Sequence, residues 1–359
     1  MNNDILKLVR PHILELEAYL PPIPTANEGR NILKLDQNEC AYGFDPAITQ
    51  ALADFQAYHI YEDASQRVLR EKIARYAGVS KEQVIASNGS NHLIDLIARV
   101  FLNPDDQVID CPPTFELFKN VTQLCQGRLV AVPRDEDFAV DIDKVLAAVS
   151  PQTKIIFLAT PNNPTGNQTP RKDILRLLDS GVVVVVDEAY YEFSGQTMVN
   201  YLDRYPNMII MRTFSKWAGL AGLRAGYALA SASLINIFMT IRLPYVMSVA
   251  AQVAVCAVLD NPKCSQEYLA RTIAERQRVY PLLKEVELFD RVMPSDTNFF
   301  LCRVVKGQAG VLSQNLRRHG IIVRHFAKDH FTKDYLRISL GTPDQNDRVI
   351  TTLKQIAEE

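Results

Sequence analysis

The sequence predicts an α/β protein with two domains: a large domain whose mostly parallel sheet is covered by helices, and a smaller α+β domain. The first reason is size, because a chain of 359 residues, 47% of them hydrophobic, exceeds the length at which one core usually divides into two. The second is that short β-branched runs alternate with helical patterns through the middle of the chain. The third is that these runs are apolar without alternation, which indicates strands covered on both faces and a mostly parallel sheet.

The large domain is expected to span residues 45–260. One of its helices is predicted by HLIDLIARVFL, residues 92–102, whose apolar side chains recur at i, i+3 and i+4. Six apolar runs are expected to form its strands: residues 83–86, 106–111, 128–132, 154–159, 182–186 and 208–211.

The small domain is expected to combine residues 1–44, which include an N-terminal arm, with residues 261–359. Residues 261–284 have the pattern of a long helix with a polar face. Three strands are expected after that helix: residues 298–304, 320–324 and 335–339. The proline-rich stretch PPIPTANEG, residues 21–29, is expected to be a connector.

Composition restricts the class of function. Lysine and arginine total 39 against 41 for aspartate and glutamate, so no net field attracts nucleic acid or an anionic membrane. The sequence has neither a secretory leader pattern nor an apolar run of about 18 residues that could span a bilayer. Its six cysteines are scattered without CxxC pairs, which argues against a zinc site or a disulfide framework. We therefore expect a cytoplasmic protein that binds small molecules and no metal.

Polar motifs follow four of the expected strands. SNGSN (residues 87–91), TPNNPTGN (160–167), DEAYYEF (187–193) and RTFSK (212–216) each begin where an apolar run ends. In an open parallel sheet, ligands bind beyond the carboxyl ends of the strands, where loops and helix N-termini meet. We therefore expect these four motifs to face one crevice.

Lys216 stands out because small residues and glycines follow it, with Arg224 eight positions later. Thr213, Ser215 and Arg224 supply two hydroxyls and a guanidinium, a set suited to a phosphate dianion. The loop SNGSN precedes a helix start, where unpaired N–H groups favour an anion. Each feature also has an ordinary interpretation. Lys216 and Arg224 could be surface charges on a loop, and SNGSN could be a plain Ser or Asn helix cap.

Asp187 ends the wholly apolar run VVVVV, and burying a carboxylate there is costly unless it meets a positive partner. A protonated pyridine nitrogen would be such a partner, and Tyr190 and Asn163 could then contact a ring hydroxyl. Singly, Asp187 could equally cap the next segment, and Asn163 could be an ordinary turn residue. Together with Lys216 and the phosphate site, these groups indicate pyridoxal phosphate, which a lysine holds as a Schiff base.

The chain resembles the fold type I pyridoxal-phosphate aminotransferases, and among them the histidinol-phosphate aminotransferases. Five segments carry the resemblance in the family's order: PPTFELF, TPNNPTG, VDEAYYEF, YPNMIIMRTFSKWAGLAGLRAGY and YLRISLGT. It implies that Lys216 forms the Schiff base and that Asp187 pairs with the ring nitrogen. It also implies that Tyr190 and Asn163 contact the 3-hydroxyl and that Phe115 stacks on the ring. The implied phosphate contacts are Ser90, Asn91, Thr213, Ser215 and Arg224.

The resemblance also implies roles toward a partner subunit and a substrate. Tyr61 would reach the cofactor phosphate of the neighbouring subunit in a homodimer, although it could also be a plain core aromatic. Arg337 would bind the substrate carboxylate, and Arg324 with Tyr19 would bind the phosphate end of histidinol phosphate. Each arginine could instead form a surface salt bridge. The implied reaction exchanges an amino group between L-histidinol phosphate, or a related amino acid, and 2-oxoglutarate.

Three segments depart from the family pattern. NECAYG (residues 38–43) stands where NENPYG is usual, Asn91-His92 where an acidic pair is usual, and YVMS (245–248) where a segment like YNVN is usual. These departures could change the substrate rather than the cofactor chemistry. A second hypothesis is therefore a pyridoxal-phosphate lyase, decarboxylase or cyclase acting on an amino acid, including a cationic one. A third, a regulatory module that retains the fold, has no DNA-binding segment or basic stripe in its favour.

Overall fold

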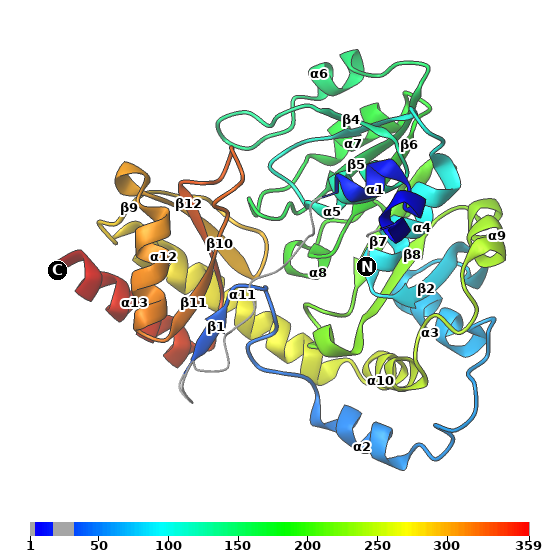
Figure 1. Cartoon of the computed structure of the whole chain (residues 1–359). Coiled ribbons are helices and arrows are strands. Elements are labelled where there is room, and N and C mark those ends of the chain that lie inside the picture. The colour runs from blue at the N-terminus through cyan, green and yellow to red at the C-terminus, as the bar shows by residue number, and fades with distance from the viewer. Residues whose placement is uncertain (1–3, 17–31, 359) are drawn as a thin grey trace.

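The computed structural model of the chain describes residues 4–16 and 32–358. These residues form two separate sheets, each with its own helices and its own hydrophobic core (Figure 1). The larger sheet has seven strands and the smaller one has five. The predicted fold class, an α/β large part with a smaller α+β part, is confirmed.

The larger sheet has the strand order β2-β8-β7-β6-β5-β3-β4. Its strands are β2 (Val84–Asn88), β3 (Gln107–Asp110), β4 (Arg128–Ala131), β5 (Thr153–Ala159), β6 (Val183–Asp187), β7 (Met208–Thr213) and β8 (Ala225–Leu229). Neighbouring strands are parallel except around β8, which is antiparallel to both β2 and β7. The six predicted strands are confirmed. The sequence analysis does not predict β8, because its residues AGYAL include no β-branched side chain.

Helices cover both faces of the larger sheet. Along β6, Val184 and Val186 pack into one core cluster and Val185 packs into another. Because side chains alternate across a strand, burial on both faces explains why the run VVVVV is apolar throughout. The α-helices of this part are α2 (Pro46–Asp54), α3 (Arg67–Ala77), α4 (Ser90–Phe101), α5 (Leu117–Leu124), α6 (Ile142–Ala147), α7 (Arg171–Leu178), α8 (Tyr191–Ser194), α9 (Ala232–Ile241) and α10 (Val249–Asp260).

The smaller sheet has the strand order β1-β11-β12-β10-β9, and only its β1 and β11 pair in parallel. Its strands are β1 (Leu33–Leu35), β9 (Phe289–Val292), β10 (Phe299–Val304), β11 (Ile321–His325) and β12 (Tyr335–Ser339). Its helices are α11 (Lys263–Lys284), α12 (Ala309–Arg318) and α13 (Pro343–Glu358). The three predicted strands and the long helix are confirmed. The strands β1 and β9 are too short for their apolar pattern to predict them.

The remaining elements are short helices. The helix α1 (Pro11–Leu14) lies beside α5, where His12 Nε2 is 3.3 Å from the Leu124 carbonyl oxygen. Short 3₁₀ helices are η1 (Asp4–Leu8), η2 (Lys81–Gln83), η3 (Val199–Tyr201), η4 (Ala221–Leu223) and η5 (Val305–Gly307). None of the helices in residues 4–16 and 32–358 is long and apolar enough to cross a membrane.

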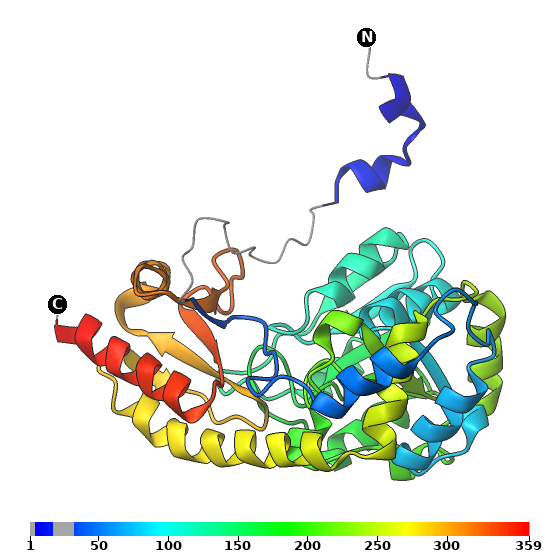
Figure 2. The ribbon, with the colours of Figure 1, turned by 90° about the horizontal axis from the view of Figure 1, so that it is seen from below.

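The long helix α11 packs against both cores. Leu269 and Ile273 contact the core of the larger sheet, whereas Val279 and Leu283 belong to the core of the smaller one. Figure 2 shows this helix running along one side of both parts of the chain. The division into domains at residues 44/45 and 260/261 stays a prediction.

Candidate active site

The four polar motifs lie at one edge of the larger sheet. The strands β2, β5, β6 and β7 run in the same direction, so their carboxyl ends meet there. Asp187, the last residue of β6, is in register with Ala159 on one side and Met211 on the other. Thr213 ends β7 in register with Gly226 of β8. The sheet therefore brings the loops after these strands together.

The loop after β2 packs against the turn before β8. Gly89 has a φ of +79°, and a Cβ at Gly226 would lie 2.6 Å from the backbone nitrogen of Ser90, so both positions require glycine. Gly89 is also the N-cap of α4, and no side chain caps the helix there. The structure does not support the interpretation of SNGSN as a plain Ser or Asn cap. The first N–H groups of α4 are directed instead toward the site, beside Arg224.

The predicted phosphate residues come from two adjoining segments. Thr213 and Ser215 are buried, with 2.9 Å between their hydroxyl oxygens. Arg224 lies so close to the start of α4 that a Cβ at Gly89 would be 2.6 Å from its Nη2. The residues grouped here are Ser90, Asn91, Thr213, Ser215 and Arg224. Hydroxyls, helix N–H groups and a guanidinium are the donors that a phosphate dianion requires.

Asp187 is a buried carboxylate for which the described part of the chain offers no ion pair. Only 7% of the residue is exposed, and its Oδ1 accepts a hydrogen bond from the Ala189 backbone nitrogen at 3.0 Å. Burial raises the pKa of Asp187 to about 6; the Ala189 hydrogen bond and Lys216 lower it, and the charge of Glu188 raises it. A cation beside this carboxylate would offset the cost of burying it.

The amine of Lys216 is enclosed by groups from both parts of the chain. Its Nζ donates to the Gln37 carbonyl oxygen at 2.8 Å and lies 6.0 Å from the centre of the Tyr190 ring. Burial, followed by the positive charge of Arg337, lowers the pKa of Lys216 to about 7. At neutral pH a substantial fraction of this lysine is therefore the neutral amine, which is the nucleophilic form.

Residues of the smaller part complete the site. Arg337 on β12 donates to Asn163 Oδ1 at 2.5 Å and to the Asp36 carbonyl oxygen at 2.5 Å. Asn38 Nδ2 donates to the hydroxyl of Tyr190 at 2.8 Å. Asn38 is not among the residues predicted from the sequence, where its only signal is its place at the start of the unusual NECAYG segment. Arg337, Asn163 and Tyr190 are thus brought to the same side of the sheet as Lys216.

Phe115 lies in the loop after β3. The hydroxyl of Thr114 donates to Asn162 Oδ1 at 2.9 Å, which holds this loop against the loop after β5. Phe115 is half-buried, and its ring meets Phe118 edge to face with 5.7 Å between centroids. Stacking of Phe115 on a cofactor ring stays a prediction.

The predicted residues Tyr61, Arg324 and Tyr19 have different outcomes. Tyr61, between α2 and α3, is 77% exposed and stacks on Tyr245 with 4.5 Å between centroids, so it is not a core aromatic. Arg324 on β11 is in register with Arg337, and both guanidinium groups lie over the Phe326 ring, at 5.5 and 5.7 Å. Tyr19 lies outside the described residues.

The grouped residues fit pyridoxal phosphate at each of its polar ends. The start of α4 with Arg224 suits its phosphate, and Asp187 has the unpaired charge that a protonated ring nitrogen would meet. The partly neutral amine of Lys216 has the chemistry to condense with its aldehyde carbon. Fold and site together define a pyridoxal-phosphate-dependent enzyme of fold type I.

The chain belongs to the aminotransferase class I and II family, whose model matches residues 30–353, and it is a pyridoxal-phosphate-dependent aminotransferase. It is 44% identical over 362 residues to the histidinol-phosphate aminotransferase of Dehalococcoides mccartyi, with 100% of both chains covered. It is 38% identical over 356 residues to the chloroplastic histidinol-phosphate aminotransferase of Nicotiana tabacum, covering 96% of this chain and 86% of that one.

A solved structure agrees with these relatives. The histidinol-phosphate aminotransferase of Sinorhizobium meliloti, determined in complex with pyridoxal-5'-phosphate, superposes with a TM-score of 0.87 at 26% sequence identity. The superposition covers 98% of this chain and 97% of that one.

Replacing Lys216 by methionine should stabilise the cofactor-free protein at neutral pH. The pKa of Lys216 is about 7 in the folded protein against an ordinary 10.5, so the unfolded chain binds more protons between these values. Lys216 therefore lowers the free energy of unfolding by its full amount below pH 7, and this destabilisation disappears as the pH rises toward 10.5. We expect Lys216→Met to raise the melting temperature at pH 7 by at least about 1 °C, which in a chain of this length is equivalent to about 1 kcal/mol.

Thermal melts of the cofactor-free protein at pH 7 and pH 10 test this expectation. Lys172→Met, at an exposed position of α7, is the control and should leave both melts unchanged. An equal gain from Lys216→Met at both pH values would contradict the lowered pKa.

Proposed function

We propose that the protein transfers the amino group of L-histidinol phosphate to 2-oxoglutarate. The observation that carries this proposal is the 41–44% identity, over the full length, to curated relatives of that name. The neighbouring guanidinium groups of Arg324 and Arg337 support it. Two such groups suit a donor that bears a phosphate and an acceptor that bears two carboxylates.

The proposed chemistry assigns the proton transfer to Lys216. When bound, pyridoxal phosphate withdraws electrons from the Cα of the amino compound attached to it. The Nζ of Lys216 takes the proton from that Cα, and a pKa near 7 suits it to act as a base at neutral pH. The carboxylate of Asp187 keeps the ring nitrogen protonated, which maintains the electron withdrawal.

The other grouped residues have proposed roles in holding the cofactor. Tyr190 and Asn163 orient the ring through its 3-hydroxyl, and Phe115 covers one ring face. The phosphate is held by Ser90, Asn91, Thr213, Ser215 and Arg224. For the substrate, Arg337 binds a carboxylate, and Arg324 with Tyr19 binds a phosphate.

We further infer that the working unit is a homodimer in the cytoplasm. Ile60, Tyr61 and Val68 are 58, 77 and 54% exposed and line a hollow of about 470 Å³ between α2, α3 and α10. Exposed apolar surface of this kind is typical of a protein interface. A second copy seated there would bring Tyr61 to the phosphate of the neighbouring site. The nearly balanced charge of the chain favours small-molecule substrates over nucleic acid or membranes.

The substrate can be tested through the absorbance of the bound cofactor. L-histidinol phosphate should convert the cofactor to its amino form, and 2-oxoglutarate should restore the original spectrum. Because charge-assisted hydrogen bonds contribute about 1.5–3 kcal/mol, Arg324→Met should raise the KM for histidinol phosphate by roughly 10- to 100-fold with a smaller change in kcat.

Arg303→Met is the matched control, because Arg303 is an arginine of the same sheet that pairs with Asp290 at 2.7 Å on the surface. It should leave both constants unchanged. Release of ammonia or carbon dioxide from an amino acid, without regeneration by 2-oxoglutarate, would favour the lyase, decarboxylase or cyclase hypothesis.

Substitution of Asp187 should affect turnover more than substrate binding. We expect Asp187→Asn to lower kcat by roughly 10²- to 10³-fold, as for the loss of a group that stabilises charge in the transition state, with a smaller change in KM. Asp110→Asn is a matched control, since Asp110 also ends a strand, is 4% exposed and has a pKa raised by burial to about 6. Equal losses in kcat and in binding would argue against this role of Asp187.

Mixing two inactive variants tests the shared site. If Tyr61 serves the neighbouring subunit, mixing Tyr61→Ala with Lys216→Ala should create dimers with one intact site. Random exchange of subunits should then recover about a quarter of the wild-type activity. Tyr58→Ala, at a nearby residue that is 48% exposed, should lose little activity alone. A monomer in sedimentation, or no recovery after exchange, would refute the shared site.

A further inference from the structure

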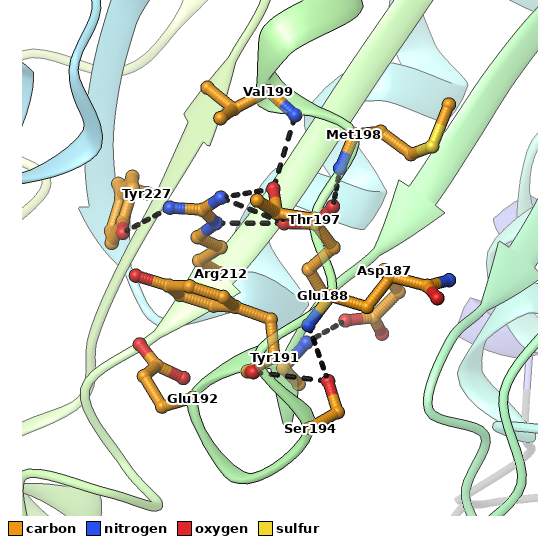
Figure 3. Close-up of polar contacts among 12 residues, drawn as sticks. Asp187, Glu188, Tyr191, Glu192, Ser194, Thr197, Met198, Val199, Arg212 and Tyr227 are labelled. Atoms are coloured by element: carbon orange, nitrogen blue, oxygen red, sulfur yellow. Dashed lines mark hydrogen bonds and ion pairs between the residues drawn. The ribbon is translucent and has the colours of Figure 1, made fainter. Parts of the chain in front are cut away.

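A buried polar network lies behind the candidate active site. It consists of Glu188, Tyr191, Thr197, Arg212 and Tyr227, and we refer to it as the backing network (Figure 3). Arg212 and Glu188 are each 1% exposed, so their ion pair is removed from water. None of the proposed functions of the site residues uses this network.

Arg212 is the centre of the backing network. Its Nε donates to Glu188 Oε2 at 2.9 Å, and its Nη2 donates to Thr197 Oγ1 at 2.6 Å. Its Nη1 reaches the hydroxyl of Tyr227 at 3.5 Å, and its guanidinium carbon lies 3.7 Å from the centre of the Tyr191 ring. Every arm of this guanidinium therefore has a partner, which fixes its orientation.

Glu188 is held as firmly on the other side of the ion pair. Its Oε1 accepts from the Met198 backbone nitrogen at 2.6 Å, and its Oε2 accepts from Thr197 Oγ1 at 2.8 Å. Its own backbone nitrogen donates to the Met211 carbonyl oxygen at 2.8 Å. The main chain just after β6 is thus tied to β7 both by a backbone hydrogen bond and by the ion pair with Arg212.

Three members of the backing network directly adjoin candidate cofactor residues in the sequence, and a fourth adjoins a glycine that packs on the start of α4. Glu188 follows Asp187, and Tyr191 follows Tyr190. Arg212 precedes Thr213, and Tyr227 follows Gly226, which packs on the first residue of α4. No member of the network is itself one of the predicted cofactor contacts.

The alternation of side chains along the strands explains this pairing. Ile209 and Met211 pack in the core cluster on the α4 face of the sheet, and Thr213 continues this alternation. Ile210 packs in the cluster on the opposite face, and Arg212 continues that one. The backing network therefore holds the strand ends from the face opposite the cofactor groups.

We propose that Arg212 and Glu188 are positioning residues that hold Asp187 and Thr213 at the separation required by the two ends of bound pyridoxal phosphate. Asp187 is proposed to meet the ring nitrogen and Thr213 the phosphate, so the inference rests on these proposed roles. The ion pair joins the ends of β6 and β7, the strands that carry the two residues. It acts through the main chain and touches neither cofactor nor substrate.

The electrostatics of the pair support the proposal. The charge of Glu188 raises the pKa of Asp187, and Arg212 is the cation that balances Glu188. Without Arg212, the unbalanced charge would make Asp187 harder to ionise. Loss of the pair would therefore change both the position of Asp187 and its pKa.

The test separates positioning from simple stabilisation by comparing single and double variants. Arg212→Met leaves Glu188 buried and unpaired, so it should lower the melting temperature and raise the Kd for pyridoxal phosphate. In the double variant Arg212→Met with Glu188→Leu, no charge is left unpaired, so the melting temperature should recover. Because the strand ends are no longer joined, its Kd should stay raised by roughly tenfold or more.

The measurements are the Kd for pyridoxal phosphate, the pH at which the visible absorbance of the bound cofactor titrates, and the melting temperature. The double variant should shift the titration midpoint as well as the Kd. Arg212→Lys, which retains the charge without the bidentate geometry, should lie between the wild type and the double variant. If Arg212→Met fails to fold, the double variant still allows all three measurements.

Arg278→Met provides the matched control, because Arg278 pairs with Glu275 through two hydrogen bonds of 2.9 and 2.8 Å in the helix α11. It should change the melting temperature without changing the Kd. A double variant with wild-type Kd and titration midpoint would overturn the proposal. Asp187→Asn is measured in parallel. If it changes neither the Kd nor the titration midpoint, the proposed role of Asp187 fails, and the positioning inference falls with it.

Discussion

A buried carboxylate that forms no ion pair with any described residue is the constraint around which the site is arranged. Asp187 ends a strand that is apolar on both faces, and burial raises its pKa to about 6. Lys216, enclosed nearby, has the opposite shift, to about 7. Near pH 7 the carboxyl of Asp187 is therefore mostly ionised, whereas about half of the Lys216 amine is neutral, so the buried carboxylate charge is only partly balanced by this lysine. A ligand with a cationic ring nitrogen and an aldehyde would offer a partner to each of the two groups. The pair therefore indicates pyridoxal phosphate more strongly than either residue does alone.

The site is assembled from both sheets rather than from the larger one alone. Lys216 donates to the carbonyl oxygen of Gln37, and Arg337 on β12 spans from Asp36 to the loop after β5. The segment before α2 also packs closely on the turn that follows Lys216. A Cβ at Gly219 would lie 2.1 Å from the carbonyl oxygen of Gly43, and Gly219 has a φ of +69°, so only glycine fits there. The residues proposed to bind substrate therefore come from the smaller part, and those proposed to hold the cofactor come from the larger part.

The two faces of the larger sheet have separate tasks at its carboxyl edge. One face carries the groups proposed to hold the cofactor, and the other carries a polar network centred on the buried ion pair of Arg212 and Glu188. Beside this network, Glu192 Oε1 accepts from the Tyr76 hydroxyl at 3.3 Å, and burial raises the pKa of Glu192 to about 8. This carboxyl is therefore mostly neutral at pH 7, and it adds little charge next to the ion pair of Arg212 and Glu188. A buried ion pair rarely improves stability over apolar packing, so its presence here points to a role in geometry.

The sequence by itself determines the fold class, the positions of the main strands along the chain and the cofactor. These follow from local signals: unbroken apolar runs for covered strands, polar motifs at their ends, and a lysine followed by glycines. Only the tertiary structure reveals β8, the contact of Asn38 with Tyr190, the neighbouring guanidinium groups of Arg324 and Arg337, and the backing network. Arg212 and Glu188 stand in the same motifs as the cofactor residues. The proposed role of Arg212 and Glu188 depends on the face of the sheet on which each side chain lies. It also depends on partners more than ten positions away in the sequence. Long-range pairing of this kind leaves no periodic pattern along the chain, so it is decided by packing.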